Sequence, residues 1–160
     1  MERCNITNSL GKYGPRVMPT LVISVDGACS GRRCACSAVL MQDGRVLAEG
    51  SRNLPQAGGY VLGAEIAGVS LAARLVQPGD GSGSIIVETD NPDVPRVIEQ
   101  GYRPRQAARL PADALAEAIA FAHRYSVAFR SLPRNSTPGL RRAHRLASRH
   151  LWVRRRLLRR

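Results

Sequence analysis

Residues 21 to 30 read LVISVDGACS, and in this stretch Asp26 and Gly27 follow five residues that suit a buried strand. Asp-Gly is a common turn pair, so one interpretation is a strand that ends in a turn. The other is a strand that presents a carboxylate at its end. Residues 84 to 90, SIIVETD, repeat the pattern, because a β-branched run leads there to Asp90.

The two aspartates would meet if their strands were parallel neighbours. In sheets with helical crossovers, functional sites gather at the carboxyl ends of the strands. Asp26 and Asp90 would then lie side by side. Taken singly, each aspartate is more often a turn residue or a helix cap, and that alternative stays open at this point.

A glutamate on the strongest helical pattern adds a third acid. Residues 60 to 79, YVLGAEIAGVSLAARLVQPG, carry apolar residues at helical spacing and stop at Pro78-Gly79. Glu65 falls on or beside the apolar face, and the only other charge of this helix, Arg74, lies about half a turn round the axis. A surface ion pair therefore does not explain Glu65.

A carboxylate among apolar groups needs compensation, and a metal ion supplies it well. Asp26, Glu65 and Asp90 together make an all-oxygen site of the kind that Mg²⁺ and Mn²⁺ prefer. Combined with a surface that attracts phosphates, such a site predicts phosphodiester hydrolysis by two metal ions.

The order of the remaining elements indicates the fold class. Strands come first as a meander and then alternate with helices, which predicts an α/β or α+β layer fold with one mixed sheet. The expected strands lie over 20–26, 84–90 and 126–132, with a further strand that includes Cys34 and Cys36 and a hairpin over 37–50 that turns at Gln42-Asp43-Gly44. The expected helices lie over 60–79, 91–101, 111–125 and 138–151, and the expected loops over 52–60, 79–84 and 101–110.

Charge is distributed very unevenly along the chain. Residues 1 to 117 hold 12 basic and 12 acidic residues, whereas residues 118 to 160 hold 12 basic residues and no acid. Clustered cations gain affinity for polyanions by releasing counterions from phosphates, so nucleic acid is the expected partner. A merely solubilising tail is the alternative.

Length and composition favour one soluble domain. A chain of 160 residues with 44% hydrophobic content can bury a real core, and it contains no apolar run long enough to cross a bilayer. Residues 1 to 19 lack the apolar stretch of a secretory signal, so we expect a cytoplasmic protein and no membrane partner. The four cysteines are accordingly expected as reduced thiols. A zinc site at Cys29, Cys34 and Cys36 is disfavoured, because no second ligand pair lies near them.

The motifs, in order, resemble those of the type 1 ribonuclease H family over roughly residues 20 to 152. They are VDGACS, GAEIAGVSLA, IIVETDN and, on the last helix, AHRLAS. The resemblance implies a ribonuclease H-like α/β fold with a five-stranded mixed sheet flanked by helices. It also implies that Asp26, Glu65 and Asp90 are metal-binding acids and that the RNA strand of an RNA–DNA hybrid is hydrolysed.

This chain departs from the family at several motif positions. His144 stands where the family usually has a final aspartate, and Val61 and Leu62 stand where asparagines commonly precede the glutamate. Arg134 and Asn135 occupy the stretch in which some members carry a flexible histidine.

These observations together predict a ribonuclease H-type endonuclease, expected as a monomer, with a loose extension over 1–19, the domain over 20–152 and a basic tail over 153–160. The catalytic residues would be Asp26, Glu65, Asp90 and His144, holding two Mg²⁺ or Mn²⁺ ions, although a packed core histidine is an alternative for His144. A degenerate module that binds nucleic acid without cutting it is the alternative function. The expected nucleic-acid contacts are Arg134, Asn135, Arg141, Arg154, Arg155 and Arg156.

Overall fold

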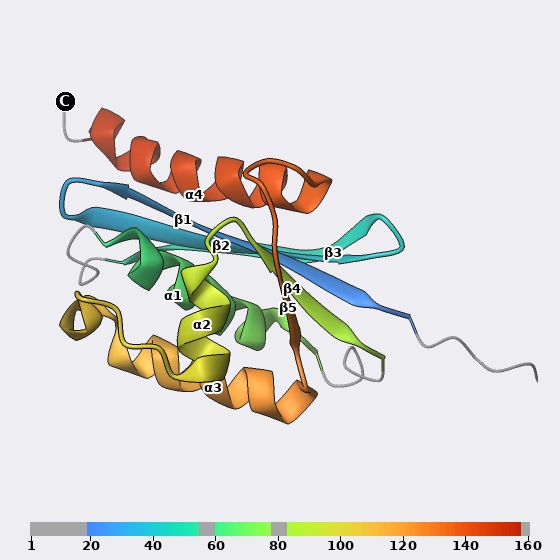
Figure 1. Cartoon of the computed structure of the whole chain (residues 1–160). Helices are drawn as coiled ribbons and strands as arrows, with labels where there is room; N and C mark the ends of the chain where they lie inside the picture. Colours follow the sequence, from blue (N-terminus) through green and yellow to red (C-terminus); the bar gives the residue numbers. More distant parts are fainter. Residues whose placement is uncertain (1–18, 55–59, 78–82, 158–160) are drawn as a thin grey trace, which may run out of the picture.

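A five-stranded mixed sheet with helices on both faces forms the protein (Figure 1). The computed structural model describes residues 19–54, 60–77 and 83–157. The strands are β1 (Leu21–Ser30), β2 (Arg33–Gln42), β3 (Arg45–Leu54), β4 (Ile85–Thr89) and β5 (Ala128–Ser131). The helices are α1 (Val61–Leu75), α2 (Asp93–Gln100), the 3-10 turn η2 (Ala107–Arg109), α3 (Ala112–Tyr125) and α4 (Pro138–Leu157).

The strand order is β3-β2-β1-β4-β5, which confirms the expected mixed sheet. The first three strands form an antiparallel meander, and β4 lies parallel to both β1 and β5. The β2–β3 turn is confirmed at Asp43 and Gly44, whose φ angles of +49° and +75° are those of a two-residue type I′ hairpin loop. β1 and β4 are therefore parallel neighbours, as the convergence of Asp26 and Asp90 requires.

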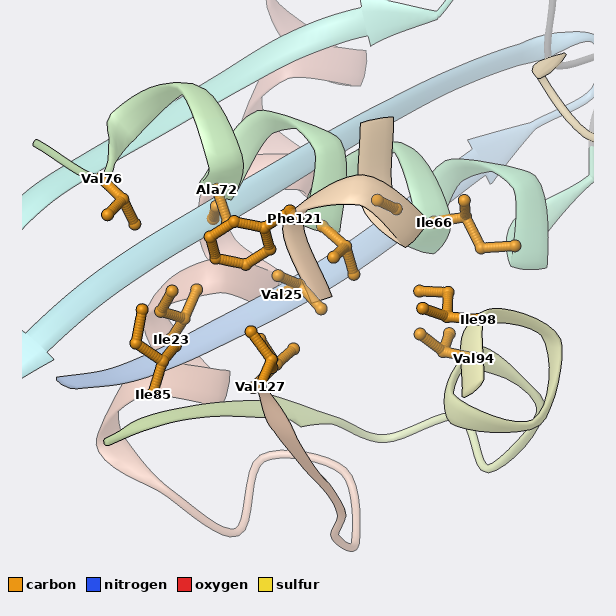
Figure 2. Close-up of a cluster of buried hydrophobic side chains, with 14 of the residues drawn as sticks. Ile23, Val25, Ile66, Ala72, Val76, Ile85, Val94, Ile98, Phe121 and Val127 are labelled. Atoms are coloured by element: carbon orange, nitrogen blue, oxygen red, sulfur yellow. The ribbon is translucent and has the colours of Figure 1, made fainter. Parts of the chain in front are cut away.

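The helices are divided between the faces of the sheet. α1, α2 and α3 lie on one face, and α4 alone covers the other (Figure 1). The core between the sheet and α1 to α3 is built from branched aliphatic side chains of β1 and β4, from Ile66 and Ala72 on α1, and from Phe121 on α3 (Figure 2). Within the described ranges no helix is long and apolar enough to cross a membrane.

Two strands run further than the sequence indicated. β1 continues to Ser30 and pairs with β2 from Arg33 onward, so the segment 30–37 is a tight hairpin turn followed by strand. Gly31, at φ +59°, starts this two-residue turn. β3 likewise extends to Leu54, where a loop was expected from residue 52. The reason is cross-strand pairing, which a scan of local composition cannot detect.

Some predicted segments lie outside the described residues. They are residues 1–18 of the expected N-terminal extension, residues 55–59 and residues 78–82 of the glycine-rich connector. The last helix, expected to end near Leu151, runs to Leu157.

Glu88, buried in β4, connects the sheet to the start of α4. Its Oε2 accepts hydrogen bonds from Ser24 Oγ at 3.2 Å and from Thr137 Oγ1 at 3.0 Å. Thr137 in turn accepts the backbone N–H of Leu140 at 3.1 Å, which caps the helix. A buried carboxylate satisfied in this way positions α4 over β1 and β2.

Gly139 marks how closely α4 approaches the sheet at this point. A Cβ atom there would lie 2.1 Å from Ser24 Oγ and 3.2 Å from Met41 Sδ. Gly139→Ala should therefore lower the free energy of unfolding by about 1–3 kcal/mol through overpacking. Thermal melts would measure the loss.

Gly50→Ala is the matched control for this prediction. The nearest atoms to a Cβ atom there are the flexible side-chain ends of Leu75, at 3.4 Å, and Leu71, at 3.7 Å. If both glycine variants melt at the wild-type temperature, α4 does not contact the sheet as closely as described.

Candidate metal centre

Three carboxylates converge where β4 ends beside the middle of β1. Asp26, Glu65 and Asp90 each offer an oxygen, and these three atoms all lie within 4.8 Å of one another. The aspartates come from neighbouring parallel strands, and the glutamate comes from the crossover helix α1 between them. The three acids that the sequence singled out are thus brought together.

Neither aspartate is a turn residue or a helix cap, the two structural roles that were the alternative. Asp26 lies within β1, paired with Ser37, and forms no turn. The start of α2 is capped by Asn91, whose Oδ1 accepts the N–H of Asp93 at 3.0 Å. Asp90 is therefore left facing the other acids, between the buried Thr89 and this capping residue.

Small residues allow α1 to bring Glu65 to the strand that carries Asp26. A Cβ atom on Gly27 would lie 2.7 Å from the backbone nitrogen of Glu65 and 2.8 Å from Ala64 Cβ. One on Gly68 would lie 3.0 Å from the carbonyl oxygen of Ser37. The glycine after Asp26 therefore serves close approach between strand and helix.

Glu65 is only 3% exposed, and its Oε2 has no hydrogen-bond partner among the described residues. Burial, followed by the charges of Asp90 and Asp26, raises the pKa of Glu65 to about 9. Burial also raises the pKa of Asp26, against the hydrogen bond and charge of His144. A cation is the group that would satisfy an unpartnered oxygen here, and an all-oxygen donor set suits a hard divalent ion.

His144 contacts one acid rather than joining the three. Its Nδ1 lies 2.9 Å from Asp26 Oδ2. Within the described ranges it is not among the residues whose ligand atoms come together within 4.8 Å. In this arrangement the imidazole holds the carboxylate of Asp26 in orientation, as partners of metal ligands commonly do.

Arg134 lies beside both His144 and Asp90. Its Nη2 is 3.2 Å from His144 Nδ1, and its Nε is 3.7 Å from Asp90 Oδ2. The side chain is 61% exposed, so its contact with Asp90 is weak and open to competition from another anion. A phosphate group at the acid cluster would meet this guanidinium.

A groove of about 450 Å³ lies along the end of β1, next to the acids, because it is lined by Gly27, which follows Asp26, and by His144, which contacts Asp26. Gly27, Ala28, Cys29 and Ser30 line it from β1, Val61 from α1, and Arg134, His144, Ser148 and Leu151 from the other side. On α4, Arg141, Arg145 and Arg149 are exposed. Arg134 is thus the arginine that lines the groove among the described residues, and the helix that borders it also exposes further arginines.

Of the other expected nucleic-acid contacts, Asn135 and Arg141 lie in the described part of the chain. Asn135 adopts a left-handed φ of +58°, and its carbonyl accepts a hydrogen bond from Arg141 Nη1 at 3.0 Å. Arg154, Arg155 and Arg156 belong to the last turns of α4, and their side chains lie outside the described part of the chain.

Two features of the site region escaped the sequence analysis. Cys29 and Cys34 form a disulfide, so the expectation of reduced thiols is wrong for this pair, while Cys36 is a free thiol. The pairing depends on the β1–β2 register, which sets the two cysteines opposite each other. The sequence analysis also did not predict that Glu88 anchors α4. The available signal was a charged residue after the apolar run of β4, which indicates a buried polar contact.

Comparison with known proteins identifies the architecture. No family model and no curated protein sequence match the chain. Among solved structures, the N-terminal RNase H domain of Rv2228c from Mycobacterium tuberculosis is similar with a TM-score of 0.67 at 20% identity, over 85% of this chain and 96% of that one. This chain has the ribonuclease H fold.

Two further structures support the same fold. RNase H1 from the halophilic archaeon Halobacterium salinarum is similar with a TM-score of 0.66 at 21% identity, over 82% of this chain and 97% of that one. LC11-RNase H1 in complex with an RNA/DNA hybrid is similar with a TM-score of 0.55 at 16% identity, over 81% and 94% of the two chains. The ribonuclease H-like sheet expected from the motifs is therefore confirmed.

The raised pKa of Glu65 predicts how stability depends on pH. The folded state holds this proton more tightly than the unfolded state, so the metal-free protein loses stability as the pH rises from about 4.5 toward 9. Glu65→Gln removes the titrating carboxyl group and with it the cost of keeping this group protonated. The melting temperature of this variant should exceed that of the wild type by about 5 °C at pH 8 and approach it at pH 5.

Glu99→Gln, which changes an exposed glutamate on α2, is the control and should melt like the wild type at both pH values. A Glu65→Gln variant that is less stable than the wild type at pH 8 would show that the carboxylate is satisfied without a metal.

Divalent-ion binding should release the proton of Glu65. Below pH 9 the ion and the proton compete for this carboxylate, so the apparent affinity for Mn²⁺ should rise with pH, by up to about tenfold per unit. Calorimetric titration in two buffers of different ionisation heat would count the protons released. Binding without proton release at pH 7 would place the ion elsewhere.

Proposed function

We propose that this protein is a divalent-metal-dependent endonuclease that hydrolyses the RNA strand of RNA–DNA hybrids. The observation that carries the proposal is the convergence of Asp26, Glu65 and Asp90, with a buried oxygen of Glu65 left unsatisfied. Support also comes from the ribonuclease H fold and from the similar LC11-RNase H1, which binds an RNA/DNA hybrid.

Each part of the site has a role in this reaction. Asp26, Glu65 and Asp90 would hold two Mg²⁺ or Mn²⁺ ions. When bound, such ions stabilise the attacking and leaving oxygens of an in-line displacement at phosphorus. His144 keeps the carboxylate of Asp26 in place, and Arg134 lies where it can exchange Asp90 for a phosphate oxygen of the substrate.

The basic surface of α4 would position the hybrid. Arg141, Arg145 and Arg149 are exposed at roughly one-turn spacing, which suits a helix that follows a phosphate backbone. Such contacts are independent of sequence, so the enzyme would cut hybrids with little base preference.

The decisive experiment incubates the purified protein with labelled RNA–DNA hybrid in Mg²⁺ and, separately, in Mn²⁺. Cleavage of the RNA strand alone is the expected result. Binding without cleavage under both conditions would instead support the alternative of a non-catalytic nucleic-acid-binding module.

Asp26→Asn and Asp90→Asn should each lower the cleavage rate by at least about 100-fold, because each removes a charge that holds the ions. Hybrid binding, measured by fluorescence anisotropy, should be retained. Asp43→Asn makes the same change at the distant β2–β3 turn, where asparagine tolerates the left-handed backbone, and should keep full activity. If both site variants cleave at rates within a few-fold of the wild type, these acids do not hold the catalytic ions.

His144 is expected to influence which metal ion is preferred. The imidazole adds no negative charge where an aspartate would, so we expect a preference for Mn²⁺ over Mg²⁺. His144→Ala should lose part of the activity, and His144→Asp should shift the preference toward Mg²⁺. Metal titrations of cleavage would measure both. If both variants cleave at the wild-type rate with the wild-type metal dependence, His144 contributes only to packing.

The basic end of α4 is expected to bind phosphate. Replacing Arg154, Arg155 and Arg156 with glutamine should reduce the slope of log affinity against log salt by about 0.7–0.9 for each arginine that binds a phosphate in the wild type. Arg124→Gln, on α3 at the opposite face of the sheet, is the control. An unchanged slope in the triple variant would show that this end of the helix does not touch the hybrid.

A further inference from the structure

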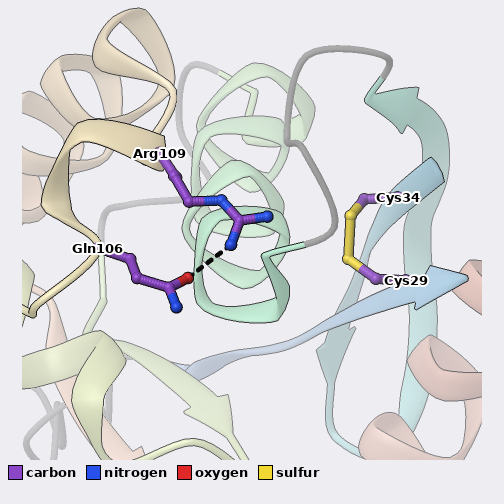
Figure 3. Close-up of a disulfide and its surroundings, with 4 residues drawn as sticks. All are labelled: Cys29, Cys34, Gln106 and Arg109. Carbon is purple, nitrogen blue, oxygen red and sulfur yellow. Dashed lines mark hydrogen bonds between the residues drawn. A yellow bond between two sulfur atoms is a disulfide. The ribbon is translucent and has the colours of Figure 1, made fainter. Parts of the chain in front are cut away.

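The disulfide between Cys29 and Cys34 joins β1 to β2 beside the N-terminal end of α1 (Figure 3). The two residues are direct cross-strand partners with Cα atoms 4.1 Å apart. The bond closes the hairpin three residues beyond Asp26 on the same strand. The bond therefore covalently ties the strand that carries Asp26 to its neighbour β2.

The disulfide also packs against the helix that carries Glu65. Cys34 and Ala64 form a buried cluster, with Cys29 and Leu54 packed against it. Ala64 directly precedes Glu65, and the same alanine lies in close contact with Gly27. The hairpin end and the first turns of α1 are thus one packed unit, and this unit sets the distance between Asp26 and Glu65.

The two sulfur-bearing residues differ in accessibility. Cys34 is 1% exposed, whereas Cys29 is half-buried and lines the groove at the end of β1. A small thiol in solution can therefore reach Cys29 from the groove side. The free thiol of Cys36 is fully buried two residues further along β2 and does not line this groove.

We propose that the Cys29–Cys34 disulfide is a redox-controlled support of the metal centre: the oxidised form holds Asp26 and Glu65 at ion-binding distance, and reduction by a dithiol loosens them. The inference rests on the proposed function, since it concerns the same three acids. Reduction removes the covalent link between the two strands whose ends pack against Ala64, so affinity for divalent ions and the order of α1 fall together.

The chemistry is ordinary thiol–disulfide exchange. A thiolate of the dithiol attacks Cys29 Sγ, the S–S bond breaks, and Cys34 leaves as a thiolate that takes up a proton. The second thiolate of the reductant then attacks the mixed disulfide and releases the sulfur of Cys29. Two electrons pass to the protein, and the reductant leaves as a cyclic disulfide.

The test compares Mn²⁺ binding by the oxidised protein with binding by protein reduced with dithiothreitol and desalted anaerobically. Calorimetry should show affinity lower by about tenfold after reduction, at the low end of the loss seen when groups that position metal ligands are removed. Amide hydrogen exchange in residues 61 to 67 should become faster. A Cys29→Ser/Cys34→Ser variant should match the reduced protein and no longer respond to dithiothreitol.

Cys36→Ala is the control and should respond to reduction like the wild type. Equal Mn²⁺ affinity and equal exchange in the oxidised and reduced protein would overturn the redox inference while leaving the metal centre intact. Failure of both forms to bind Mn²⁺ would overturn the proposed function, and the inference with it. If the double serine variant does not fold, the comparison of oxidised with reduced wild type still decides.

Discussion

The mutual repulsion of three carboxylates, one of them that of the buried Glu65, is the constraint on which the rest of this structure depends. Like charges within 4.8 Å disfavour ionisation, and the burial of Glu65 strengthens this effect by removing water. A chain that places these groups together without a cation loses stability at neutral pH. The surrounding packing must therefore be strong enough to hold a site whose benefit appears only when an ion binds.

Close packing of backbone on both faces of the sheet supplies that rigidity. On one face, Gly27 and Gly68 let α1 approach β1 and β2 at distances that any larger residue would block. On the other face, Gly139 and the buried Glu88 hold the start of α4. The two helices thus fix the strand that carries Asp26 from opposite sides, so the acids cannot easily move apart.

The acids of the candidate metal centre and the exposed arginines of α4 are separated in space. Three acids meet at one small site, whereas exposed arginines follow α4, the helix that borders the groove. A polyanion would be attracted by the basic surface and repelled locally by the acids until cations neutralise them. Arg134, which touches both His144 and Asp90, lies at the boundary between these two regions.

The sequence alone determined the order of the elements, the turn at Asp43 and Gly44 and the choice of the three acids. These features follow from strand and helix periodicity and from an unpaired charge on an apolar face, which are properties of neighbouring residues. The tertiary structure alone decided the extension of β1 to Ser30, the Cys29–Cys34 bond, the anchoring role of Glu88 and the contact of His144 with Asp26 rather than with all three acids. Each of these depends on cross-strand register or on contacts between residues far apart in the chain, and no local pattern encodes such distances.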